Sequence, residues 1–143
     1  MSARDRYHEE FKTALENEGW AVTDDPLTVQ LGSIPVQIDM GAERLITADK
    51  GSERIAVEVK TFRHPSFITD MYQAVGQYIC YHFILKRKGS DRKLYLGMPT
   101  DTYLEYEEEP LMEIFDEYKI PLILYDYENE NIDKWITQPN TKR

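Results

Sequence analysis

Cysteine is nearly missing from this sequence: Cys80 is the single one among 143 residues. A disulfide needs two cysteines, so a disulfide-stapled scaffold and a cysteine-rich zinc module are excluded, and a reducing cytoplasm is expected. No apolar run approaches the ~18 residues of a spanning helix, and the N-terminus lacks the apolar segment of a secretory signal. We therefore expect a cytoplasmic protein without membrane association.

Glycine and proline are also sparse, with seven of each in the chain. They form no linker, and no internal repeat or low-complexity tract divides the sequence. A hydrophobic content of 41%, with 12% aromatic residues, is enough for a sizeable core, although 30% of the residues are charged. The expectation is a single domain over residues 1–143.

Positive charge is almost absent from one segment. Residues 101–133 contain twelve Asp/Glu and one basic residue, Lys119, for a local balance of −11. The rest of the chain has sixteen Lys/Arg and fourteen Asp/Glu, so it is nearly neutral although the net charge is −9. The first hundred residues could therefore approach a polyanion, whereas the acidic segment should face away from it or bind a basic protein.

Hydrophobic periodicity and turn residues predict the order α-β-β-β-α-β-α-β. Helices are expected over residues 3–18 and 65–89 and from residue 110 onward. Extended chain is expected over residues 20–23, 36–62, 93–98, 121–125 and 132–136, with a hairpin that pairs residues 44–48 with 54–60. This alternation predicts one central mixed sheet with helices on both faces, an α/β fold.

The apolar positions of each expected helix indicate which face is buried. In the first helix these positions are Tyr7, Phe11, Ala14 and Leu15. In the helix that begins at Pro65-Ser66 they are Ile68, Met71, Tyr72, Val75, Ile79 and Phe83. In the helix that begins at Pro110 they are Leu111, Ile114, Phe115 and Tyr118.

The segment Ile55-Ala56-Val57-Glu58-Val59-Lys60 carries the most informative polar residues. Side chains alternate along a strand, so Glu58 and Lys60 share one face while Val57 and Val59 enter the core. In metal-dependent phosphodiester cleavage, a carboxylate binds a hard divalent cation, and a lysine orients or deprotonates the attacking water. The alternative is a plain ion pair on a solvated strand face.

A metal site of this kind needs a second acid near Glu58. A hairpin that folds about Lys50-Gly51 sets Glu43 opposite Glu58, and cross-strand neighbours lie ~5 Å apart. Asp39 lies further along the same strand, ~13 Å from Glu43 if the strand is straight. A bulge at Gly41 could bring Asp39 into the site. Both acids therefore remain candidates.

Several segments carry a resemblance to a known family. They are Ala3-Arg4-Asp5, Gly19-Trp20, Asp25-Pro26-Leu27, Ile38-Asp39-Met40-Gly41-Ala42-Glu43, Ile55-Ala56-Val57-Glu58-Val59-Lys60, Ala74-Val75-Gly76-Gln77-Tyr78 and Leu124-Tyr125-Asp126. With them the chain resembles the XisH family, the fdxN element excision controlling factors, and more broadly the PD-(D/E)XK nuclease superfamily. It departs from the superfamily at one point, because Ile38 stands before Asp39 where a proline is usual.

This resemblance implies a restriction-endonuclease-like fold and a role in site-specific DNA excision, with Mg²⁺ or Mn²⁺ held by Glu58 and either Asp39 or Glu43. It implies that Lys60 is catalytic, that Gln77 reaches toward the metal or a phosphate, and that Glu9 points at the site. It also implies an XisI-like companion protein, which a catalytically inactive regulator would bind, and leaves homo-oligomerisation open. For Gln77 and Glu9, the alternative is an ordinary place on a helix surface.

A basic cluster is a candidate for binding DNA phosphates without reading sequence. Its members are Lys86, Arg87, Lys88, Arg92 and Lys93. The alternative is a solvated helix end and loop. The three histidines, His8, His64 and His82, lack the spacing of metal ligands, so the sequence assigns them no site.

Overall fold

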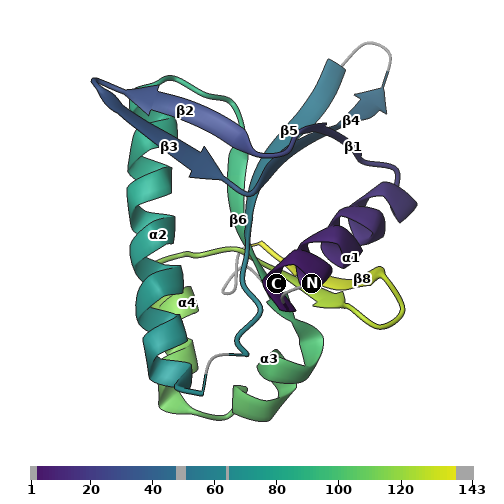
Figure 1. Ribbon diagram of the computed structural model, residues 1–143, viewed down its shortest axis with the longest axis vertical. Helices are drawn as coiled ribbons and strands as arrows, with labels where there is room; N and C mark the ends of the chain where they lie inside the picture. The colour runs from purple at the N-terminus through teal and green to yellow at the C-terminus, as the bar shows by residue number, and fades with distance from the viewer. Residues whose placement is uncertain (1–2, 48–50, 64, 138–143) are drawn as a thin grey trace.

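A six-stranded sheet forms the centre of the molecule (Figure 1). The computed structural model describes residues 3–47, 51–63 and 65–137. The helical elements are α1 (Ala3–Asn17), α2 (Phe67–Arg87), α3 (Thr100–Tyr106), the 3-10 turn η1 (Pro110–Glu113) and α4 (Ile114–Glu117). The strands are β1 (Ala21–Asp24), β2 (Leu27–Leu31), β3 (Ile34–Ile38), β4 (Met40–Thr47), β5 (Gly51–Val59), β6 (Lys93–Pro99), β7 (Leu122–Asp126) and β8 (Asn131–Ile136).

The sheet is mixed, as the sequence predicts. Its strand order is β1-β4-β5-β6-β7-β8. Strands β5, β6 and β7 run parallel to one another, joined by α2 and by the helices between β6 and β7, and the remaining pairs are antiparallel. None of the helices in the described ranges is both long and apolar enough to cross a membrane.

Each face of the sheet has its own core. On one face α1 packs against β8 and β1, with Phe11 and Leu15 in the same buried cluster as Val57 and Val59. On the other face α2 and α4 cover the sheet, with Met71 and Ala56 in a second buried cluster (Figure 1). The expectation of helices on both faces is confirmed, as is the burial of the predicted apolar residues of α1.

The buried face of α2 differs from the predicted one. Four of its expected core residues are 40–70% exposed: Ile68, Tyr72, Ile79 and Phe83. The residues that α2 buries are Met71, Ala74, Tyr78, Ile84 and Leu85. Because this helix is apolar around much of its circumference, periodicity does not decide which stripe meets the sheet.

The chain from Pro26 to Ile38 and the chain after β6 also differ from the sequence expectation. Strands β2 and β3 form a separate two-stranded sheet, which Figure 1 shows projecting beside the upper part of α2. The helix expected from Pro110 is short, and α3 precedes it. In this region Phe115 is buried as predicted, whereas Leu111 and Tyr118 are exposed.

Candidate functional site

Strand register decides which acid lies beside Glu58. Met40 pairs with Val57 and Glu43 pairs with Arg54, so the prediction of Glu43 opposite Glu58 is wrong. The pairing differs from the expected one because Thr47 pairs with Gly51, with a register shift between Leu45 and Thr47; the turn predicted at Lys50 lies outside the described residues. Asp39, immediately before β4, is the acid that comes level with Glu58.

Gly41 does not bulge toward β5 to achieve this arrangement. It pairs in register with Ala56. A Cβ at this position would lie 2.7 Å from the Nη1 atom of Arg92. The glycine therefore makes room for a guanidinium group, and Asp39 reaches the site by its place in the register.

The carboxylates of Asp39 and Glu58 each accept a hydrogen bond from a backbone N–H of the other segment. The backbone N–H of Asp39 donates to Glu58 Oε1 at 3.2 Å, and the backbone N–H of Val59 donates to Asp39 Oδ2 at 2.8 Å. Both carboxylate residues are buried, with exposed fractions of 7% and 6%. Burying two carboxylates side by side is costly unless positive charge or hydrogen-bond donors compensate them.

Lys60 supplies one positive charge to this pair. It follows β5 directly, where its N–H donates to the Gly97 carbonyl at 2.9 Å, and its Nζ lies 3.6 Å from Glu58 Oε2. The Tyr125 hydroxyl donates to the Lys60 carbonyl at 3.1 Å. Burial raises the pKa of Tyr125 well above its ordinary value, so this hydroxyl remains a donor that fixes the Lys60 backbone.

The two carboxylates open into a cavity of about 600 Å³. Glu9 of α1 and Gln77 of α2, both proposed from the sequence, line it together with Asp39 and Glu58. The other lining residues are His8, Asp25, Pro26, Gln37, Ile38 and Tyr81. Lys60 is not among the lining residues, so it reaches the cavity through its contact with Glu58.

Gln77 contributes an oxygen without a partner. Its Oε1 is buried and accepts no hydrogen bond from the described residues. An unpaired buried acceptor costs free energy, which a cation or a donor from a ligand would recover. Carboxylate and amide oxygens are the donors that Mg²⁺ and Mn²⁺ prefer, so Asp39, Glu58 and Gln77 fit a hard divalent cation.

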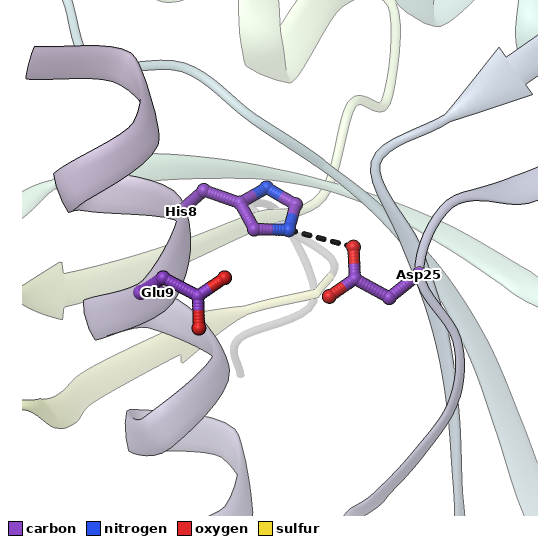
Figure 2. A group of neighbouring side chains, drawn as sticks. All are labelled: His8, Glu9 and Asp25. Carbon is purple, nitrogen blue, oxygen red and sulfur yellow. Dashed lines mark hydrogen bonds and ion pairs between the residues drawn. The ribbon is translucent and has the colours of Figure 1, made fainter. Parts of the chain in front are cut away.

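A second polar cluster lies on the wall of the same cavity, and Figure 2 shows it between α1 and the chain before β2. One ligand atom each from His8, Glu9 and Asp25 lies within 4.8 Å of the other two. His8 Nε2 lies 2.7 Å from Asp25 Oδ1, and Lys12 Nζ lies 3.3 Å from Asp25 Oδ2. Lys12 therefore places a positive charge beside Asp25, as Lys60 does beside Glu58.

His8 and Asp25 are cavity residues that sequence reasoning misses. The sequence assigns His8 no site and places Asp25 in a turn signal only. The position of His8 next to Glu9 on the polar face of α1 is the available signal. The contact with Asp25 depends on how α1 packs against a distant turn, which periodicity does not give. His64 lies outside the described residues.

The predicted phosphate-binding cluster divides into two parts. Lys86, Arg87 and Lys88 are exposed at the end of α2, and Lys88 lies two turns beyond the cavity residue Tyr81. Arg92 is different, because its side chain is 6% exposed. Its guanidinium pairs with Asp24 at 2.8 Å and donates to the Ile55 carbonyl at 2.8 Å. The Arg92 guanidinium is therefore engaged in contacts between strands, unlike the exposed side chains of its basic neighbours.

Comparisons with known proteins agree on one family. The family model described as XisH protein matches residues 1–133. An fdxN element excision controlling factor from Anabaena variabilis is 40% identical, with a TM-score of 0.83 over 93% of this chain and 99% of that chain. An XisH family protein from Nostoc punctiforme PCC 73102 is 38% identical, with a TM-score of 0.82 over 92% and 99%.

No curated protein matches the chain significantly. The agreement with the family model and with both crystal structures extends over nearly the whole sequence, including the strands that bring Asp39 level with Glu58. By sequence and by fold, this chain belongs to the XisH family.

Proposed function

We propose that this chain holds Mg²⁺ or Mn²⁺ between Asp39 and Glu58 and acts on DNA as a metal-dependent nuclease of the PD-(D/E)XK type. The observation that carries the proposal is the meeting of two buried carboxylates at one cavity, with a lysine 3.6 Å from one of them. A sheet could be built more cheaply with apolar residues at both positions. Their burial therefore favours a functional requirement over a surface ion pair.

Each residue has a distinct task in this proposal. Asp39 and Glu58 hold the cation, and Gln77 offers its unpaired Oε1 to the cation or to a phosphate. Lys60, beside Glu58, orients the attacking water through its ammonium group. Glu9 faces the same cavity from α1 and assists in positioning water. A bound divalent cation would act as a Lewis acid on the phosphodiester.

The DNA would approach along the end of α2. Lys86, Arg87 and Lys88 are exposed there, and they would neutralise phosphates without reading bases. The Anabaena relative is named as a factor that controls excision of the fdxN element. Site-specific DNA excision is accordingly the process that we propose for this chain.

Two variants test the site. Glu58→Gln should weaken Mn²⁺ binding by more than about tenfold, because a charged ligand is lost. Lys60→Met should keep Mn²⁺ affinity but lose DNA cleavage, because the cation ligands remain while the group beside the water is gone. Titration calorimetry and a duplex cleavage assay, with circular dichroism for folding, provide the readouts. Unchanged Mn²⁺ affinity in folded Glu58→Gln would contradict the proposal.

A second candidate function is a catalytically inactive regulator that binds an XisI-like companion protein. The exposed acidic surface of α3 and the turn after it, Glu105 and Glu107–Glu109, favours this candidate because it suits a basic partner. Replacing Glu107, Glu108 and Glu109 with Gln should then weaken companion binding while DNA affinity stays level. Pull-down with the companion, and cleavage assays with and without it, separate this candidate from the nuclease.

A further inference from the structure

The side of α2 that faces away from the sheet is apolar and exposed. Four large side chains form it, and we call them the outer face: Ile68, Tyr72, Ile79 and Phe83. Residues 71–85 contain no Asp, Glu, Lys or Arg. In Figure 1 α2 forms the left flank of the molecule. We propose that the outer face binds the outer face of a second copy of this chain, with the two α2 helices antiparallel.

The spacing of the four residues is what points to a second copy. Ile68 and Phe83 lie at equal distances from the midpoint between Val75 and Gly76, and so do Tyr72 and Ile79. A two-fold symmetric interface uses one patch twice, so each contact occurs in both directions. An antiparallel pair centred on this midpoint sets Tyr72 against the partner's Ile79 and Ile68 against the partner's Phe83.

The same residues form the ridges that helix packing requires. Ile68 with Tyr72, and Ile79 with Phe83, are each four residues apart, and rows with this spacing form ridges that pack into the grooves of a facing helix. Gly76 lies beside the crossing point. It is exposed, and a Cβ added there would meet nothing within 4 Å. The glycine therefore lets the two helix backbones approach closely.

A hollow next to Ile79 provides a place for the most exposed aromatic side chain. This groove of about 400 Å³ is lined by Ile79 and His82 of α2 and by Tyr118, which is itself exposed, together with the basic residues Arg92, Lys93 and Lys119. In the antiparallel pair, the partner's Tyr72 lies against Ile79, at the mouth of the groove. Entry of that ring would occur twice, once on each side of the two-fold axis.

The apolar area sets the strength of the contact. A large aromatic side chain has an area of about 150–250 Å². With the exposed fractions of its four residues, the outer face exposes roughly 400 Å² of apolar surface per copy. A standard interface buries about 800 Å² per partner. The outer face supplies about half of this area, and the groove with Tyr118 extends it. The dimer is therefore weak and depends on protein concentration.

Sedimentation equilibrium of the full chain, from about 5 to about 500 μM, tests the proposal. Wild type should shift from monomer toward dimer. Ile79→Glu and Tyr72→Lys should each shift the dissociation constant upward by more than about tenfold, because each buries an unpaired charge. The double variant should recover dimerisation, since the introduced ammonium of one copy would face the introduced carboxylate of the other. Leu104→Glu, on exposed α3, is the matched control and should dimerise like wild type.

Cross-linking tests the register. Gly76→Cys in a Cys80→Ser background places a thiol beside the two-fold axis, so mild oxidation should give a covalent dimer. Leu104→Cys in the same background should give none. A chain that remains monomeric at about 500 μM would overturn the proposal, and so would a dimer that persists in Ile79→Glu.

Discussion

At the scale of single residues, the contacts of each charged side chain distinguish the candidate site from the residues that join strands. The sequence proposes Glu58, Lys60 and Asp39 for one site, and the fold places the Asp39 N–H and the Lys60 ammonium beside the Glu58 carboxylate. Arg92 looks like its basic neighbours in sequence, yet it is buried against Asp24 and two strand carbonyls. The difference depends on the tertiary position of Gly41, which no local pattern reveals.

The contrast between Arg92 and Arg87 gives a test. Arg92→Met should lower the free energy of unfolding by about 2–3 kcal/mol, because it leaves the Ile55 carbonyl and Asp24 without their charged donor. Arg87→Met, at the exposed end of α2, should change it by less than about 0.5 kcal/mol. Chemical denaturation measures both. Equal, small effects would show that the Arg92 contacts contribute nothing to stability.

At the scale of secondary-structure elements, helix ends are more predictable than helix faces. Ser66 begins α2 as expected and accepts a hydrogen bond from the Thr69 N–H at 3.2 Å, and the positive-φ Gly89 follows its end. Capping is a local property, so the sequence carries it. Which face of α2 is buried depends on how the helix packs against the whole sheet. The small β2–β3 sheet also depends on tertiary packing, because it lies beside α2. Neither feature is predictable from the local sequence pattern.

The cap of α2 can be tested directly. Ser66→Ala should lower the free energy of unfolding by about 1 kcal/mol, because the first turn loses an acceptor for the Thr69 N–H. Ser66→Asp is the matched variant: its carboxylate also caps and interacts favourably with the helix dipole, so stability should stay near wild type. Thermal and urea unfolding give the comparison. If Ser66→Ala and Ser66→Asp lower the free energy of unfolding equally, loss of the cap does not explain the destabilisation.

At the scale of the whole molecule, the sequence predicts a mixed sheet with helices on both faces, and this is confirmed. Strand order follows from the hairpin and the two crossovers, which turn signals and periodicity make visible. The register of β4 and β5 is not predictable to the residue, because it depends on where the hairpin closes. The predicted register places Glu43 opposite Glu58, whereas the observed register places Asp39 there.

The buried tyrosines predict how the whole fold responds to alkali. Burial raises the pKa of Tyr78 to about 12, whereas an unfolded tyrosine ionises near 10. As the pH rises, Tyr78 therefore loses its proton in the unfolded chain before it does so in the folded one. Its contribution to the free energy of unfolding is complete below pH 10 and is lost between pH 10 and 12. Tyr78→Phe should make the alkaline fall in stability shallower by up to ~1.4 kcal/mol per pH unit, in urea unfolding from pH 8 to 12.

Tyr118→Phe, whose ring is exposed, is the control for that measurement. Burial also raises the pKa of Tyr125, so part of the alkaline fall should remain in Tyr78→Phe. An identical pH dependence in wild type and Tyr78→Phe would contradict the stated role of Tyr78.

The central claim is that Asp39 and Glu58 hold a divalent cation. Anomalous diffraction from crystals soaked in Mn²⁺ tests it most directly, because the signal locates the metal without reference to activity. The account predicts the strongest peak between the carboxylates of Asp39 and Glu58, and loss of that peak in Glu58→Gln. A strongest peak at His8, Glu9 and Asp25, with none between Asp39 and Glu58, would contradict it.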